Sequence, residues 1–424
     1  MRGTALLFGF LAAAAVCAVA WVVFRDRGAE PVPPASPLPI DTASGTADTG
    51  KASAKPPGPA RPGRGKRPPV PDEPGFQATR ESCLEFLKRH AGSFSPEPGQ
   101  GDVPLFPEVR AAALEALQSL DPAAAEPLIL EALSGDGHAE AWDEDRLAAA
   151  ALRIRAGKPD GAETVRAFLK AGDFEDWGAV AAAAAAASWM APEEGGKAVG
   201  RLFAGGFADY DEDAQAAVLR AAAVLGRGVP AEDLRAILAN REEAYEAKVL
   251  GAAAGALKRL GDDAGRRVLD SLSDLDWAEE VPPGLAARGN GAVLPWLQGL
   301  LRNEDALVRA AAARAIGVVG EKSAAPSLQA ALKDEDESVR AEAAVALVVL
   351  GDAAGIPGAR AAVASQDPEV QAAAWKALAL AGDPGSKDAA AALLASPLPG
   401  TRSGLRGGAL LPRVWAARLF AGGR

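Results

Sequence analysis

The sequence predicts an all-α protein, and within that class an α-solenoid of repeated helix pairs. A pattern with a period of 31 residues covers 303–395, which is typical of arrays whose units bury apolar faces against their neighbours. Hydrophobic residues make up 49% of the chain but aromatic residues only 5%. Alanine-rich segments with few aromatic residues favour closely packed helices over strands.

The period is visible at four positions of the repeat. An aspartate, a valine, a larger aliphatic residue and a glycine each recur in one register. These residues are Asp305, Asp336 and Asp367; Val308, Val339 and Val370; Ile316, Leu347 and Leu378; and Gly320, Gly351 and Gly382. The apolar members follow one another at helical spacing, so each block is expected to bury one helix stripe.

Each block has the start and stop signals of two helices. Asp305 is placed to cap the first helix, because its carboxylate can accept from an unpaired amide of the first turn. Gly320 is placed to end that helix in a left-handed conformation. Pro326 favours the start of a second helix, since its missing N–H is not needed there.

The blocks resemble the HEAT repeat, in particular the short HEAT repeats of phycobilisome-lyase-like proteins. The shared feature is an aspartate followed by a valine–arginine pair. It is present as Asp305 with Val308-Arg309 and as Asp336 with Val339-Arg340. The third block keeps Asp367 but has Gln371 in place of the arginine. In this family the aspartate and arginine stack between repeats, which implies a ladder that ends at Gln371.

Less regular units surround these blocks. Residues 72–302 are interpreted as degenerate HEAT-like repeats whose spacing varies, which brings the total to about nine helix pairs. A helix over 78–90 is expected to cap the first of them. Residues 396–424 are interpreted as a loop and a half-repeat that closes the solenoid, because the sequence around Trp415 echoes that around Trp375.

The segment 4–24 contains no charged residue and is long enough to cross a bilayer as a helix. An uncleaved signal anchor is the favoured interpretation, and a cleaved signal peptide is the alternative, because Ala18-Val19-Ala20 has the form of a cleavage site. The short N-terminal head favours a body on the periplasmic or extracellular side of the cell membrane. A cytoplasmic body is the alternative, since basic residues flank both ends.

Residues 25–71 are rich in proline and glycine and are expected to form a disordered linker. Nine basic and four acidic residues fall within 1–71, whereas the remaining 36 basic and 52 acidic residues give the body a net charge of −16. An acidic body argues against nucleic acid as a partner. The alanine, arginine and proline usage is typical of bacterial genomes rich in G and C.

No group in the sequence predicts catalysis, a metal site or a cofactor. His90 and His138 have no nucleophile or second ligand at a suitable spacing, and Cys83 is the only cysteine after residue 17. The acidic run 209–213 lacks the glycine and the glutamate of a calcium loop. The protein is therefore predicted not to be an enzyme.

The favoured function is a membrane-tethered scaffold that binds a protein partner on its solenoid surface. The concave face is expected to be mostly Ala and Val with a protruding Trp375, and the candidate contact residues are Arg314, Val345, Trp375 and Lys376. Trp375 could instead pack on the next repeat or the C-terminal segment. A lyase-like or pigment-handling function, which would need a charged pocket in the concavity, and a purely structural spacer remain alternatives.

Overall fold

The computed structural model describes residues 77–91, 107–134, 143–172, 174–240, 245–275, 277–396 and 403–422. The predicted membrane segment (4–24), the predicted linker (25–71) and His138 lie outside these ranges. Among the described helices, none combines the length and the hydropathy needed to span a bilayer. All regular secondary structure in the described chain is helical, with no strand, which confirms the predicted all-α class.

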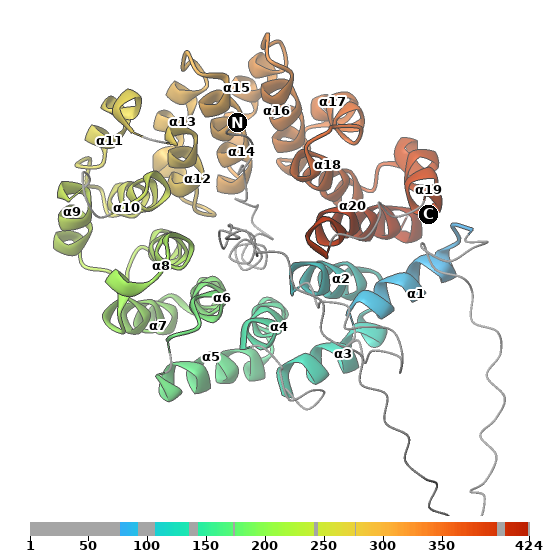
Figure 1. Cartoon of the computed structure of the whole chain (residues 1–424), viewed down its shortest axis with the longest axis horizontal. Helices are drawn as coiled ribbons and strands as arrows, with labels where there is room; N and C mark the ends of the chain where they lie inside the picture. The colour runs from blue at the N-terminus through green and yellow to red at the C-terminus, as the bar shows by residue number, and fades with distance from the viewer. Residues whose placement is uncertain are drawn as a thin grey trace, which may run out of the picture.

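The helices alternate along the chain between an outer and an inner layer (Figure 1). The outer helices are α1 (Arg80–Ala91), α3 (Pro122–Ser134), α5 (Pro159–Ala171), α7 (Pro192–Ala204), α9 (Ala231–Ala239), α11 (Arg266–Asp270), α13 (Leu294–Leu300), α15 (Ala325–Ala331), α17 (Ile356–Ala362) and α19 (Lys387–Ala395). The inner helices are α2 (Pro107–Leu120), α4 (Asp143–Arg155), α6 (Trp177–Ala187), α8 (Glu212–Leu225), α10 (Ala247–Arg259), α12 (Val281–Leu285), α14 (Ala306–Val319), α16 (Glu337–Val349), α18 (Pro368–Ala381) and α20 (Ser403–Gly422). Because successive helices are antiparallel, all inner helices run in the same direction.

The inner layer closes on itself. Each inner helix packs against the next one from α2 to α20, and α20 then packs against α2, so the solenoid is a ring (Figure 1). The outer helix α1 also packs against α20. Nine inner–outer pairs therefore follow one another in sequence, and the two ends of the described chain supply a tenth, α20 with α1.

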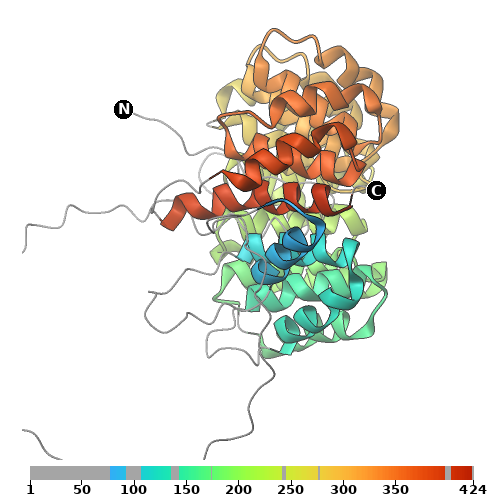
Figure 2. The same ribbon diagram turned by 90° about the vertical axis from the view of Figure 1, so that its right-hand side faces the viewer.

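The closing helix α20 is held by apolar side chains from its second half. Val414, Trp415 and Leu419 are all buried against neighbouring helices. Figure 2 shows α20 lying along the side of the ring, between the first and last repeats. The segment after residue 396 thus does more than cover the last repeat, because it joins that repeat to the first one.

Local sequence signals set the helix ends as expected. The carboxylates of Asp305, Asp336 and Asp367 accept hydrogen bonds from backbone amides at the starts of α14, α16 and α18. Gly320 and Gly382 end α14 and α18 in the left-handed conformation, with φ of 80° and 66°. Pro326 lies in the first turn of α15, where a helix tolerates it.

Small residues explain how the inner helices pack with so few aromatic side chains. Every residue of α6 after Trp177 is buried, and most of them are alanine. At the contact of α10 with α12, a Cβ added at Gly284 would lie 2.3 Å from the carbonyl oxygen of Lys248. Only glycine permits this backbone approach. Close packing of backbones therefore replaces large core side chains.

Candidate functional site

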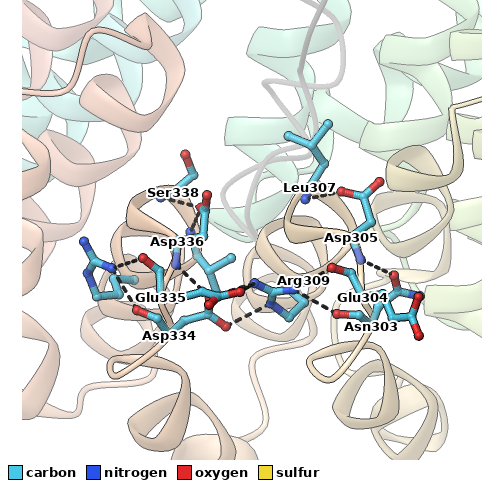
Figure 3. A network of polar contacts seen from close by, with 11 residues as sticks. Asn303, Glu304, Asp305, Leu307, Arg309, Asp334, Glu335, Asp336 and Ser338 are labelled. Carbon is cyan, nitrogen blue, oxygen red and sulfur yellow. Dashed lines mark hydrogen bonds and ion pairs between the residues drawn. The ribbon is translucent and has the colours of Figure 1, made fainter.

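Arg309 links two neighbouring repeats at the edge of the ring where the inner helices begin (Figure 3). Its Nε and Nη2 donate to the carboxylate of Asp334, each over 2.9 Å, and its Nη1 donates to the carbonyl oxygens of Asn303 and Glu304. The paired guanidinium holds the pKa of Asp334 below its usual value. This bidentate pair fixes one loop against the next.

The arginine ladder implied by the family resemblance differs in its acidic partner. Asp305, Asp336 and Asp367 act as helix caps, and the carboxylate bound by Arg309 is Asp334. Arg340 donates to the carbonyl oxygens of Asp334 and Glu335. One period after Asp334 stands Ser365, which offers Arg340 no carboxylate.

The four candidate contact residues all lie in the interior. Arg314, Val345, Trp375 and Lys376 are each at most 6% exposed. The guanidinium of Arg314 donates to Glu342 across the contact of α14 with α16, with Nε to Oε1 at 2.9 Å. Trp375 packs in the core, which was the alternative to its protruding from the surface. That a partner contacts these four residues stays a prediction.

The inner face is more polar than expected, because it contains buried ion pairs between inner helices. Lys376 on α18 pairs with Glu115 on α2 over 3.3 Å, with side-chain exposures of 3% and 11%. The ammonium of Lys376 also lies 4.6 Å from the ring centroid of Trp415 on α20. These contacts join the first and last repeats, so they belong to the closure of the ring.

Further charged side chains continue this network toward the opposite side of the ring. We define the central cluster as Glu115, Arg155, Trp189, Arg288, Lys376 and Arg418. Arg418 on α20 donates from Nε to the hydroxyl of Ser119, one turn after Glu115 on α2, over 3.0 Å. Other connections of the cluster run through Glu115, whose Oε1 accepts from Arg155 Nη1 over 3.1 Å. The guanidinium carbons of Arg155 and Arg288 lie 5.0 Å and 3.5 Å from the ring centroid of Trp189. Cation–π contacts of this kind orient the guanidinium groups.

The elements that carry these residues lie on different sides of the ring (Figure 1). Arg288 follows α12 and donates to the carbonyl oxygen of Ser188, which follows α6, over 3.1 Å. Two inner helices, α8 and α10, separate α6 from α12 along the layer. A contact between α6 and α12 therefore crosses the inside of the ring, near the edge where inner helices end.

The central cluster contains four cationic side chains and one carboxylate. Within the described chain, Arg155 and Lys376 share Glu115, whereas no carboxylate forms an ion pair with Arg288 or Arg418. Burial lowers the pKa of Arg288, and the nearby charge of Arg155 lowers it further. Burial also lowers the pKa of Arg418. Arginine nevertheless stays protonated in proteins, so the cluster has an excess of positive charge.

Other titratable groups serve the fold. The described residues contain no group of three or more histidine, cysteine or acidic side chains that could hold a metal. Burial raises the pKa of Cys83 to about 12, so its thiol is a poor nucleophile. In the acidic run 209–213, Asp211 caps α8 and Asp213 pairs with Lys248.

Sequence reasoning missed Glu115, Arg155, Trp189, Arg288 and Arg418. Glu115 sits six residues after Val109 on its helix, as Arg314 does after Val308, so an alignment of the irregular repeats could have placed it on the inner face. Arg288 lies in a loop after the short helix α12. No local signal in the sequence connects that loop to Trp189, which is 99 positions away.

Apart from the central cluster, exposed apolar side chains lie at the edge where the inner helices begin. We call this edge the N-terminal rim and define it by Trp177, Trp277 and Leu307. Trp177 begins α6, Trp277 precedes the 3₁₀ turn Ala278–Glu280 that leads into α12, and Leu307 is in the first turn of α14. Their side chains are 41%, 44% and 44% exposed. Trp277 also has a φ of 59°, a left-handed conformation that is unfavourable for a residue with a Cβ.

Alternating layers, a common helix direction and a periodic register define the class of this protein as an α-solenoid. Residues 284–348 and 325–406 match the family model of HEAT repeats. This part of the chain therefore belongs to the HEAT-repeat family, as the sequence resemblance predicted. No curated protein matches the chain.

Several solved structures are similar to the chain. An engineered protein, target OR497 of the Northeast Structural Genomics Consortium, is 21% identical over 78% of this chain and 98% of its own, with a TM-score of 0.26. Importin β in an ammonium sulfate condition is 14% identical over 78% of this chain, with a TM-score of 0.27. Kap95 in a complex with Nup1 is 13% identical over 73%, with a TM-score of 0.25. The chain spans 50% and 47% of these last two chains, and at such TM-scores the likenesses carry no argument about function.

Proposed function

We propose that this protein is a non-catalytic scaffold that binds a protein partner through the N-terminal rim of its ring. The observation that carries this proposal is the exposure of Trp177 and Trp277 on that rim. Tryptophan is enriched among residues that dominate protein–protein binding, since it offers a large contact area at a small cost in conformational entropy. A rigid ring presents these side chains in a fixed arrangement, which lowers the ordering cost of association.

The charge around these side chains supports a basic partner. Acidic residues stand beside each of the three anchors: Asp176 caps α6, Glu279 and Glu280 follow Trp277, and Asp305 caps α14. Acidic residues are favourable there because the helix dipole places partial positive charge at the N-terminus. Since every inner helix begins at the same rim, the apolar anchors stand among carboxylates. Complementary charge on a partner would speed association and fix its orientation.

Membrane tethering is part of the proposal. The uncharged segment 4–24 would anchor the chain, and 25–71 would join the anchor to the ring, with the body outside the cell membrane. Tethering would raise the effective concentration of the ring near a membrane partner. Digestion of the body by a protease added to spheroplasts, whose outer envelope has been removed but whose cell membrane is intact, is the expected result. Protection of the body until the membrane is permeabilised would place it inside.

The test is crosslinking and affinity capture of the full-length protein from membranes. Trp177→Ala and Trp277→Ala are expected to reduce capture of a defined partner about tenfold or more, as binding hot spots do. Both side chains are exposed, so melting temperatures should stay close to that of the wild type. The matched control is Leu130→Ala, which removes a similarly exposed apolar side chain (43%) from the outer helix α3. Equal losses with Leu130→Ala would exclude the rim as the binding surface.

A lyase-like or pigment-handling function is the second candidate, and the central cluster is the observation that favours it. Such a function needs a charged site in the concavity, and Arg155, Arg288 and Lys376 provide charge there. Capture experiments that yield no partner, together with an absorbing molecule that copurifies with the ring, would favour this function. Absence of both would favour a structural spacer.

A further inference from the structure

We propose that the central cluster is a binding site for a compact, multiply charged anion whose charge is carried by carboxylate or phosphate oxygens. The proposal goes beyond partner binding, because the cluster lies toward the ends of the inner helices and the N-terminal rim lies at their starts. The two sites can therefore be tested separately.

The charge inside the ring is unbalanced. Arg155 and Lys376 share the carboxylate of Glu115, and within the described chain Arg288 and Arg418 pair with none, which leaves the cluster with a net charge of +3. Uncompensated cations that have lost part of their hydration are unfavourable unless an anion joins them. This excess is local, since the whole chain has a net charge of −11. An anion bound here would complete the ion pairs.

The guanidinium groups of the cluster are held in fixed orientations. Arg155 and Arg288 both contact the indole of Trp189, and Arg288 is further held by the carbonyl oxygen of Ser188. A guanidinium that is already oriented loses little entropy when it binds an oxyanion, and its planar donors match carboxylate and phosphate oxygens. The side chain of Arg155 is 28% exposed, and Arg288 and Arg418 are half-buried, so donors are available to a ligand.

The charge of the whole body limits the size of the anion that can reach the cluster. A long polyanion would have to approach an acidic body and would be repelled by it. A compact anion with two or three charges concentrates its interaction on the cluster. The surrounding charge therefore selects against nucleic acid and favours a small organic polycarboxylate or a phosphate ester.

Isothermal titration calorimetry of the full-length protein with citrate and with pyrophosphate tests the proposal. We expect binding of at least one of them, with an affinity that falls as salt is added. Arg288→Gln and Arg155→Gln should each weaken binding about tenfold or more, because each removes a charged hydrogen-bond donor. A preference for citrate or for pyrophosphate would identify the ligand as a carboxylate or a phosphate. Binding of neither anion would overturn the proposal.

Glu115→Gln is the variant that separates a binding site from a structural network. It removes the only carboxylate of the cluster, so binding of the preferred anion should tighten about threefold or more. A variant that merely damages the ring would instead bind more weakly. Weaker binding by Glu115→Gln, with the folded state intact by circular dichroism, would contradict the proposal.

The matched control is Arg266→Gln on the outer helix α11, where the exposed arginine pairs with Asp270. It changes the net charge by the same amount and should leave anion affinity unchanged. An equal loss of affinity in this control would mean that only the overall charge matters, which would overturn the proposed site.

An acidic peptide that binds more tightly than either small anion would overturn the proposed ligand class. Trp177→Ala should not affect anion binding. A failure of the proposed partner binding at the rim can therefore be distinguished from a failure of the proposed anion binding at the cluster.

Discussion

At the scale of single residues, acidic side chains at the edge where the inner helices begin differ sharply in their surroundings. Glu144, near the start of α4, is buried, and its Oε1 has no hydrogen-bond partner. Burial raises its pKa to about 9, and the negative charges of Asp145, Asp176 and Glu108 add to this shift. Asp334, in contrast, is bound by Arg309 and has a lowered pKa. A glutamate and an aspartate at similar edges of the ring thus have opposite effects on pH dependence.

The raised pKa of Glu144 predicts a loss of stability at alkaline pH. The folded protein binds the proton of Glu144 more tightly than the unfolded chain does, so proton binding contributes to the free energy of unfolding. This contribution is fully present below the unfolded pKa of the carboxyl and is lost as pH rises toward about 9. Glu144→Gln keeps the shape without the charge and should be more stable than the wild type at pH 8.5 by about 1–3 kcal/mol. At pH 5 the two proteins should be similar.

Urea unfolding at these two pH values measures the effect. Glu163→Gln is the control, since Glu163 is exposed on α5 and its substitution should alter stability little at either pH. Groups whose pKa is lowered in the folded protein, such as Asp334, contribute to stability above their unfolded pKa. They lose this contribution only in acid, at pH values below the two that are compared. A Glu144→Gln protein whose advantage does not grow with pH would show that Glu144 is ionised when folded.

At the scale of the elements, the regular repeats are joined by polar contacts that vary from block to block. Between α14 and the next repeat, Arg309 forms a bidentate ion pair with Asp334. The next link lacks the acid, because Ser365 occupies the equivalent position and its hydroxyl only accepts from the amide of Asp367. Asp334 makes the same backbone contact, to the amide of Asp336. The loop before α18 is therefore shaped to accept an aspartate.

Ser365→Asp is expected to complete the missing link. The new carboxylate should keep the hydrogen bond to the amide of Asp367 and pair with Arg340, which stabilises the protein by about 0.5–1.5 kcal/mol. Thermal or urea unfolding measures the gain. In a double-mutant cycle with Arg340→Ala, the coupling between the two positions should account for most of it. Equal gains with and without Arg340 would mean that the aspartate acts only through the backbone.

At the scale of the whole molecule, the ring has no free solenoid end within the described chain. An open array needs polar terminal units, because its first and last repeats each leave one face unpacked. Here α20 covers the faces of α2 and α18, and α1 packs outside α20. The pair of Lys376 with Glu115 fixes this junction between residues 261 positions apart. Closure therefore replaces the usual caps and couples the two ends of the body in folding.

Circular permutation tests this closure. A chain that begins at residue 245, continues to 422, and then joins residue 77 and ends at 240 opens the ring between α9 and α10 instead. A flexible linker of about 20 residues, with a reach of about 25 Å, should join α20 to α1 without strain. The permutant is expected to have the helicity and the radius of gyration of the unpermuted 77–422 body, and nearly its melting temperature.

Small-angle scattering and circular dichroism compare the two chains, with the same linker added to the C-terminus of the unpermuted body as the control. An open solenoid would hold α1 and α20 apart, so the permutant would be expanded or would fail to fold. That result would show that α20 does not meet α1 and α2 in solution.

The sequence by itself determined the features that depend on neighbouring residues along the chain. The capping role of Asp305, the helix ends at Gly320 and Gly382, and the 31-residue register were all predicted because each depends on a few adjacent residues. The HEAT-repeat class followed from recurrence of these local signals. The sequence left open whether Trp375 protrudes or packs on a neighbouring element, because its environment depends on how α18 packs, and in the structure it is buried.

Only the tertiary structure decided that the array is a ring with charge at its centre. Curvature arises from a small rotation between each repeat and the next, and the sequence of a single repeat does not reveal the total rotation. Closure brings Glu115 to Lys376 and the loop of Arg288 to Trp189, which are distant in sequence. The charge of the inner face could not be predicted for the same physical reason, because which side chains meet inside the ring depends on the accumulated rotation of all ten helix pairs.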